Sequence, residues 1–139
     1  ENQSFSAERH VLRGLHLQVN PTPQAKLIRV LKGSIYDVAV DVRPGSSSFG
    51  RWVSCELSAD AFNQLYIPTG FAHGFLTLEP GVEVFYKVSA PYAPSCERSI
   101  IWNDNPEAVF VSAFDGSTRT LSANGLMFKA ICYIFLINN

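Results

Sequence analysis

Histidine and basic side chains are the residues of this sequence best suited to acid–base chemistry on an anionic ligand. His16 follows Arg13 by three positions and precedes Lys26 by ten, and all three lie on or beside segments of strand-like composition. A histidine has an ordinary pKa of about 6.5 and can accept a proton near neutral pH, whereas arginine and lysine bind negative charge. The three side chains could converge on one anionic ligand. Taken singly, they fit better as two surface charges and a strand histidine with a local hydrogen bond.

His73 follows a Pro-x-Gly turn formed by Pro68, Thr69 and Gly70. This segment looks like the second motif of cupin proteins, in which the proline and the glycine set a turn and the histidine points into the barrel. Metal-binding cupins add a His-x-His pair and a glutamate, because a divalent transition metal needs several nitrogen or oxygen ligands that converge on one point. The sequence contains no His-x-His pair, and we therefore expect no metal site. The plain alternative is a histidine that is hydrogen-bonded within its own strand turn.

Short strands are the elements that must position these residues. From Gln24 to about Trp102, β-prone segments alternate with turn residues, and no stretch keeps a helical apolar period. This pattern is typical of an all-β jelly roll of about seven or eight strands, which can hold a ligand between its two sheets. The segment Lys32-Gly33-Ser34 predicts a tight hairpin. Residues 112–125 are predicted to form a polar loop.

Residues 34–43 alternate between two faces. The even-numbered positions from Tyr36 to Val42 are hydrophobic, which predicts a strand with one core face. The other face carries two carboxylates, Asp37 and Asp41, and we expect it to meet polar surroundings. Asp37 could orient a histidine or a lysine, or it could be a strand carboxylate satisfied by local hydrogen bonds.

Composition narrows the classes of protein and partner. The chain has 139 residues, of which 47% are hydrophobic, and its formal net charge is −1. Such a chain has the size of one domain, and its balanced charge gives no footprint for nucleic acid or for an anionic membrane. Three widely spaced cysteines indicate neither a disulfide framework nor a thiolate metal site and are typical of a cytoplasmic protein. The apolar stretch 126–137 is too short for a membrane-spanning helix.

A family resemblance is carried by five segments, which are Arg13–Gln18, Gln24–Leu27, Tyr36–Arg43, Gly70–Phe75 and Tyr86–Lys87. They occur in the order and approximate spacing found in the dTDP-4-dehydrorhamnose 3,5-epimerases, a family of cupin-type sugar-nucleotide epimerases. The sequence resembles this family over residues 1–104, and we interpret residues 105–139 as a divergent C-terminal extension of the same domain. The resemblance implies a cupin-type jelly roll, also called a double-stranded β-helix.

The resemblance also implies an activity. Members of the family convert dTDP-4-dehydro-6-deoxy-D-glucose to dTDP-4-dehydro-L-rhamnose in dTDP-L-rhamnose biosynthesis, which serves lipopolysaccharide and cell wall polysaccharide. They invert C3 and C5 through an enolate, without a metal or an organic cofactor, and they form homodimers. We therefore expect a cytoplasmic isomerase that binds a dTDP-sugar. Epimerisation at one carbon only and 3,4-ketoisomerisation stay open as alternatives.

Residue roles follow from the same resemblance. His16 matches the family's base, Tyr86 its proton donor, and Lys26 the residue expected to stabilise the enolate oxygen. These assignments are chemically sensible, because inversion needs a base and an acid on opposite faces of the sugar and a positive group beside the enolate oxygen. The guanidinium of Arg13 suits diphosphate oxygens. The expected substrate-binding residues are Arg13, Gln18, His73 and Asp37.

Two features depart from the family pattern. The family's Leu-Ser-x-Lys-Asp motif supplies a carboxylate that orients the base, and here it corresponds to Leu121–Gly125, with Gly125 in place of the aspartate. Family members also have further strands before the segment that matches Asn2. Loss of a base-orienting carboxylate can lower rates by orders of magnitude without abolishing binding. The second hypothesis is therefore a catalytically impaired or truncated sugar-nucleotide-binding cupin.

Overall fold

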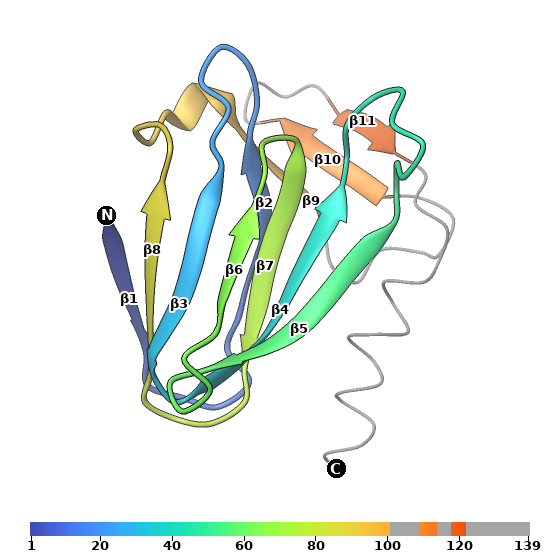
Figure 1. Ribbon diagram of the computed structural model, residues 1–139. Coiled ribbons are helices and arrows are strands. Elements are labelled where there is room, and N and C mark those ends of the chain that lie inside the picture. The colour runs from blue at the N-terminus through green and yellow to red at the C-terminus, as the bar shows by residue number, and fades with distance from the viewer. Residues whose placement is uncertain (101–108, 114–117, 122–139) are drawn as a thin grey trace.

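The computed structural model describes residues 1–100, 109–113 and 118–121, which form two antiparallel sheets packed face to face (Figure 1). The smaller sheet has the strand order β1 (Asn2–Ser6), β8 (Val82–Val88), β3 (Lys26–Lys32) and β6 (Gln64–Ile67). The larger sheet has the order β11 (Thr118–Leu121), β10 (Val109–Ala113), β9 (Glu97–Ile100), β2 (Leu12–Gln18), β7 (Phe71–Thr77), β4 (Ser34–Asp41) and β5 (Trp52–Ser58). A short 3₁₀ turn, Pro94–Cys96, precedes β9. The expected all-β class is confirmed.

Hydrophobic side chains fill the space between the sheets, because alternate residues of each strand point inward. Ile28 of β3, Ile35 of β4 and Val84 of β8 are each at most 1% exposed. Burial of one such side chain stabilises the fold by about 1.5–3 kcal/mol. The core cluster comprises Ile28, Val30, Ile35, Ala39, Leu57, Ile67, Phe75, Val82 and Val84.

Strand β4 is buried on both faces, so the polar surroundings expected for its two carboxylates are side chains of the protein and not water. Val38 and Val40 pack into a second hydrophobic cluster together with residues of β2, β7 and β9. The opposite face carries Ala39 in the core cluster, and Asp37 and Asp41 are 0% and 1% exposed. Alternation shows only that the two faces differ in composition. It does not show that one of them meets water.

The turns differ from the prediction in two places. Gly33, expected in a hairpin, leads the chain from the smaller sheet to the larger one, because β3 and β4 belong to different sheets. Its φ is +78°, and an added Cβ would lie 2.9 Å from Cγ2 of Val82, so the turn favours glycine. The predicted polar loop over residues 112–125 instead includes, in its described part, the last two residues of β10 and all of β11, which pair with each other.

Two opposed glycines allow β2 and β7 to approach closely near the site. Gly14 has a φ of +101°, and a Cβ on it would lie 2.5 Å from the carbonyl oxygen of His73 and 2.6 Å from Cα of Gly74. The strand register shifts between Arg13 and His16, as in a bulge. After this shift His16 lies directly opposite His73. The bulge therefore brings the two histidines together.

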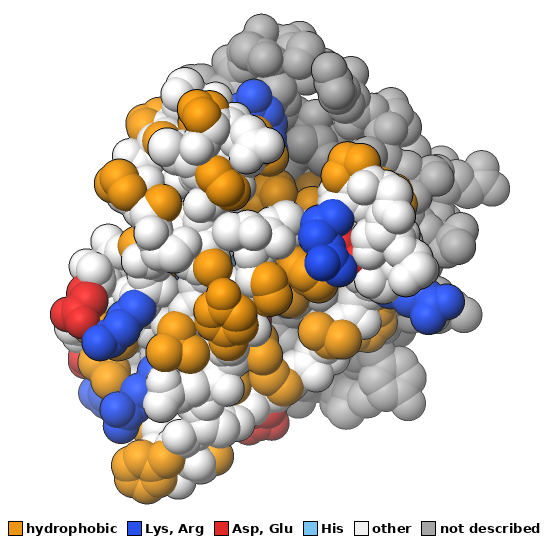
Figure 2. All heavy atoms as spheres, turned by 45° about the horizontal axis from the view of Figure 1, so that its top comes forward, with side chains coloured by type: hydrophobic (Ala, Val, Ile, Leu, Met, Phe, Trp, Pro, Cys, Tyr) orange, Lys and Arg blue, Asp and Glu red, His pale blue; other side chains and the backbone are white. Residues whose placement is uncertain are grey.

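The surface of the described residues carries both apolar and basic side chains. Figure 2 shows hydrophobic groups spread over one face of the molecule beside several Lys and Arg side chains. Within the described ranges, no helix is long and apolar enough to cross a membrane. Cys55 and Cys96 are free thiols, whereas Cys132 lies outside these ranges. The large hydrophobic side chains that are exposed are Phe5, Leu31, Val53, Phe62, Tyr66 and Tyr92.

Candidate active site

A cavity between the two sheets collects most of the predicted site residues. Its volume is about 200 Å³. A wider hollow of about 590 Å³ adjoins it and shares His16, Lys26 and Tyr86 with it. Of the seven predicted residues, five line the smaller cavity and Gln18 lines the wider one. The smaller cavity is lined by Ser4, Arg13, His16, Lys26, Ile28, His73, Phe75, Val84 and Tyr86.

His16 belongs to the larger sheet and is half-buried. Its ring stands edge-on to that of His73, with the ring centroids 6.3 Å apart and the planes at 70°. Burial, reinforced by the positive charge of Lys26 and by His73, lowers the pKa of His16 from its ordinary value to about 3. The imidazole is therefore neutral at pH 7 and able to accept a proton, although it is a weaker base than an ordinary histidine.

His73 and Asp37 form a buried pair behind His16. Nε2 of His73 lies 2.9 Å from Oδ2 of Asp37, and their side chains are 5% and 0% exposed. An ionised carboxylate only accepts hydrogen bonds, so Nε2 of His73 carries the proton it donates. The second carboxylate oxygen, Oδ1, is buried and receives no hydrogen bond from the described residues. Asp37 thus holds His73 in place and retains one unused acceptor.

Lys26 faces the site from the smaller sheet and is 6% exposed. Burial lowers its pKa from the ordinary value to about 8, while the negative charges of Glu97 and Asp37 oppose that shift. A group with a pKa near 8 is mostly protonated at pH 7. The cavity therefore keeps a buried cation, and the two carboxylates help to hold its charge.

Tyr86 lies on β8, also in the smaller sheet, and is half-buried. Strand register places it directly opposite Ile28 of β3 on one side and Asn2 of β1 on the other. It lines both hollows, as His16 does. The candidate base and the candidate acid therefore enter one cavity from opposite sheets. This arrangement suits the removal of a proton from one side of a bound molecule and its return from the other.

Arg13 stands at the edge of the smaller cavity and is held by β1. Its Nη2 donates to the carbonyl oxygen of Phe5 at 3.1 Å, and its Nε donates to Oγ of Ser6 at 3.3 Å. These bonds orient the exposed guanidinium of Arg13, which lines the cavity and keeps Nη1 free of these two acceptors. Such a group can bind an anionic part of a ligand.

Gln18 makes its hydrogen bonds to the backbone of two loops. Its Nε2 donates to the carbonyl oxygens of Thr22 at 2.9 Å and Pro91 at 3.2 Å, and its Oε1 accepts from the backbone N–H of Ala93 at 2.9 Å. The amide thus ties together the loops that border the wider hollow. A direct contact between Gln18 and substrate stays a prediction.

Several residues of the site were missed by the sequence analysis. Ser6 helps to fix Arg13, and Glu97 borders the wider hollow and acts on the charge of Lys26. Phe75 and Val84 line the smaller cavity. Phe75 ends the Gly70–Phe75 segment, in which only His73 was singled out. No local pattern marks Ser6, Val84 or Glu97, because sheet pairing brings them from strands far apart in sequence. Gly125, predicted to replace an orienting carboxylate, lies outside the described residues.

A metal site is not evident in the described part of the chain. There, no group of three or more His, Cys, Asp or Glu side chains is arranged to hold a metal ion. The hydrogen bond from His73 to Asp37 occupies one ring nitrogen of that histidine. Activity without a metal or an organic cofactor stays a prediction.

Comparison with known proteins assigns the chain to a family. The family model described as dTDP-4-dehydrorhamnose 3,5-epimerase matches residues 1–124. The chain belongs to the dTDP-4-dehydrorhamnose 3,5-epimerase family. The resemblance carried by the five sequence segments is thereby confirmed.

Curated relatives of this epimerase-family chain are similar to it over three quarters of its length. It is 49% identical over 104 residues to a dTDP-4-dehydrorhamnose 3,5-epimerase of Sinorhizobium fredii, covering 75% of this chain and 53% of the relative. It is 51% identical over 104 residues to the enzyme of that name from Salmonella typhimurium, covering 75% of this chain and 56% of the relative. The chain thus spans about half the length of the curated relatives it matches.

Solved structures of the family share the fold. An epimerase of Bacillus anthracis with TDP and PPi bound is 50% identical, with a TM-score of 0.73, and the match covers 74% of this chain and 59% of that one. An epimerase of Legionella pneumophila in complex with dTDP-4-keto-L-rhamnose is 47% identical, with a TM-score of 0.70, and the match covers 74% and 54%. The expected cupin-type jelly roll is confirmed.

Proposed function

We propose that this chain epimerises a dTDP-4-dehydro-6-deoxyhexose at C3 and C5 without a metal or an organic cofactor, converting dTDP-4-dehydro-6-deoxy-D-glucose to dTDP-4-dehydro-L-rhamnose. The observation that carries the proposal is the placement of His16 and Tyr86 on opposite sheets around one cavity that also holds Lys26. Family membership supports the same reaction.

The first step is proton abstraction by His16. The imidazole takes a proton from a carbon beside the C4 ketone, and the electron pair of the broken C–H bond forms an enolate. Because burial keeps His16 neutral, the base needs no prior deprotonation at pH 7. General base catalysis of this kind contributes about 10²–10⁴-fold.

Lys26 stabilises the enolate. Its ammonium donates to the C4 oxygen as negative charge develops there, in a cavity where water screens little. His73 faces the same cavity, and Asp37 fixes its ring. Removal of one such donor costs about 10²–10³-fold in rate in comparable sites.

Inversion is completed by Tyr86. Its phenol gives a proton to the enolate carbon on the face opposite His16, and the phenolate and the imidazolium then exchange protons with solvent. Arg13 would hold the diphosphate at the edge of the cavity. A second cycle at the other carbon gives the doubly inverted product.

A relative with two altered residues supports the pairing of base and acid. The relative is a 3'-monoepimerase of Streptomyces bikiniensis solved in complex with dTDP, 35% identical with a TM-score of 0.68, and the match covers 71% of this chain and 49% of that one. In that double mutant a histidine and a tyrosine 70 positions apart are replaced. His16 and Tyr86 have the same separation.

Three further expectations concern the location of the chain, its oligomeric state and the extent of its domain. We propose that the chain acts in the cytoplasm and as a homodimer, as the family resemblance implies. We also propose that residues 105–139 extend the domain formed by residues 1–104. Sedimentation of the purified chain tests the dimer, and a monomer at high concentration would contradict it.

Exchange of substrate protons with solvent tests the reaction directly. Incubation with dTDP-4-dehydro-6-deoxy-D-glucose in D₂O should place deuterium at both C3 and C5, as read by proton NMR. His16→Asn should abolish exchange, whereas Tyr86→Phe should lower formation of the inverted product by about 100-fold and retain some exchange. Tyr66→Phe, on an exposed tyrosine outside both hollows, is the matched control.

The outcomes separate the hypotheses. Deuterium at one carbon alone would indicate a single-carbon epimerase. Tight binding of dTDP with no exchange at either carbon would reject catalysis and favour an impaired sugar-nucleotide-binding cupin.

A further inference from the structure

Three hydrophobic side chains line the smaller cavity beyond the reactive groups. Ile28 of β3, Phe75 of β7 and Val84 of β8 are 1%, 7% and 1% exposed. All three belong to the core cluster between the sheets. The wall that they form is therefore backed by the hydrophobic core.

Strand register places this apolar wall beside the reactive groups. Ile28 lies directly opposite Tyr86, and Phe75 lies directly opposite Arg13. Val84 lies two residues before Tyr86 on the same strand and on the same face. A sugar held by its diphosphate at Arg13 and presented to Tyr86 thus has this wall next to its ring.

We propose that Ile28, Phe75 and Val84 receive the substituent on C5 of the sugar and select a methyl group over a hydroxymethyl group. The inference rests on the proposed function, because it assigns the part of the substrate that this wall meets. A hydroxyl group buried against the wall loses its hydrogen bonds to water, and hydrophobic side chains offer none in exchange. Discrimination of this kind amounts to about 10- to 100-fold.

Inversion at C5 gives a second reason for a wall without hydrogen-bonding groups. When C5 inverts, its substituent moves from one side of the mean ring plane to the other. A donor or acceptor aimed at a C6 oxygen would fit one epimer and lose its partner in the other. Dispersion contacts with a methyl group are not directional, so the same wall can serve both epimers.

Binding of two sugars that differ in one hydroxyl group tests the selection. Calorimetric titration of the 139-residue chain with dTDP-6-deoxyglucose and with dTDP-glucose gives the ratio of their dissociation constants. Neither sugar has the ketone, so the ratio does not depend on turnover. We expect the unaltered chain to prefer the 6-deoxy sugar by about 10- to 100-fold.

A matched pair of variants assigns the preference to the wall. Val84→Thr adds a hydroxyl group that faces the cavity and should reduce the preference to a few-fold. Val82→Thr makes the same change two residues earlier on the same strand, at a core residue that does not line the cavity. It should leave the ratio unchanged.

Three results would overturn the inference. Equal affinity of the unaltered chain for the two sugars would do so, and so would binding of neither sugar. An equal change of the ratio in Val84→Thr and Val82→Thr is the third, and if a variant does not fold the ratio of the unaltered chain decides. A retained preference without deuterium exchange would reject the proposed reaction but leave the selection intact.

Discussion

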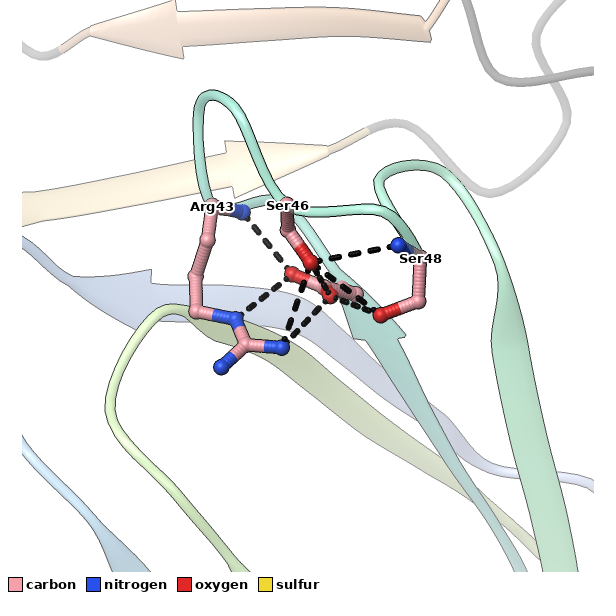
Figure 3. Close-up of polar contacts among 4 residues, drawn as sticks. Arg43, Ser46 and Ser48 are labelled. Carbon is pink, nitrogen blue, oxygen red and sulfur yellow. Dashed lines mark hydrogen bonds and ion pairs between the residues drawn. The ribbon is translucent and has the colours of Figure 1, made fainter.

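The two ends of the buried part of β4 hold one aspartate each, and the two carboxylates have contrasting surroundings. Asp41 accepts hydrogen bonds from Nε of Arg43 at 2.9 Å, from Nη2 of Arg43 at 2.7 Å, and from the hydroxyl groups of Ser46 and Ser48 at 2.6 Å each (Figure 3). Among the described residues, Asp37 has one hydrogen-bond partner, His73, and its other carboxylate oxygen has none. Both residues are at most 1% exposed.

The contrast separates a carboxylate that stabilises a loop from one that contacts a residue of the cavity. The hydrogen bond from Arg43, supported by those from Ser46 and Ser48, holds the pKa of Asp41 well below its usual range, although burial opposes the shift. Such a group is locked in its charged form and closes a loop. Asp37 has spare acceptor capacity and lies against a histidine that lines the cavity, so its charge is available to the site.

The largest expected effect comes from the matched changes Asp37→Asn and Asp41→Asn. Asp37→Asn removes the charge that orients His73 and supports Lys26, and it should lower the rate of deuterium exchange by about 100-fold. Its free energy of unfolding should change by less than about 1 kcal/mol, because the amide oxygen can still accept from His73. Exchange kinetics and urea unfolding of both variants measure the contrast. Equal loss of rate in the two variants would contradict the different roles assigned to Asp37 and Asp41.

Asp41→Asn should have the reverse pattern. The amide group cannot replace two charged oxygens that receive bonds from Arg43, Ser46 and Ser48, so the free energy of unfolding should fall by about 2–4 kcal/mol. The rate per folded molecule should be unchanged, because Asp41 lines neither hollow. A large drop in rate with normal stability would show that this end of β4 also serves the site.

The pH dependence of the rate should follow the ionisation of Lys26, whose positive charge is supported by Asp37. Lys26 loses its proton above its pKa of about 8, so kcat/KM should be level near pH 7 and fall by about tenfold per pH unit above pH 9. Lys26→Arg, which stays charged, should remove this alkaline fall. A profile that stays level to pH 10 would contradict the role of Lys26.

The free energy of unfolding provides a control for the pH profile of the rate. As pH rises above 8, ionisation of Lys26 should lower the rate but raise the contribution of Lys26 to stability. The pKa of Lys26 is about 8 in the folded chain and near its ordinary value when unfolded. Between these values the unfolded chain binds more protons, so the contribution of Lys26 to stability rises with pH. Urea unfolding across the same pH range should show that the fall in rate does not come from ionisation-driven unfolding at Lys26.

The smallest expected effect is that of Arg43→Lys. Arg43 is 47% exposed on its side chain and pairs with Asp41 through two nitrogens. Lysine keeps the charge but not the two-pronged geometry, and Ser46 and Ser48 still bond to Asp41. The free energy of unfolding should therefore fall by about 1 kcal/mol or less. A loss as large as that of Asp41→Asn would mean that Arg43 alone holds the loop.

The sequence predicted strands better than it predicted their partners. Alternation in residues 34–43 marked β4 correctly, because side-chain period depends only on local chain geometry. It could not show that both faces of β4 are covered, or that Gly33 passes between sheets, because these depend on pairing with strands far along the chain. The site divides in the same way. His16, Lys26, His73 and Tyr86 lie in recognisable motifs, and so does Phe75, whereas Val84 and Glu97 come to the two hollows through register alone.

The passage between sheets at Gly33 has a consequence for how the chain folds. β1 can pair only after β8 has been synthesised, since Asn2 lies opposite Tyr86. β3 likewise pairs only with β6 and β8, which follow it in the chain. Contacts between such distant segments must close long loops, which slows folding. A nascent chain that ends after β7 would hold both histidines of the cavity on one wall and lack the strand that carries Tyr86. His16 and Tyr86 can therefore meet only after most of the described chain has been synthesised.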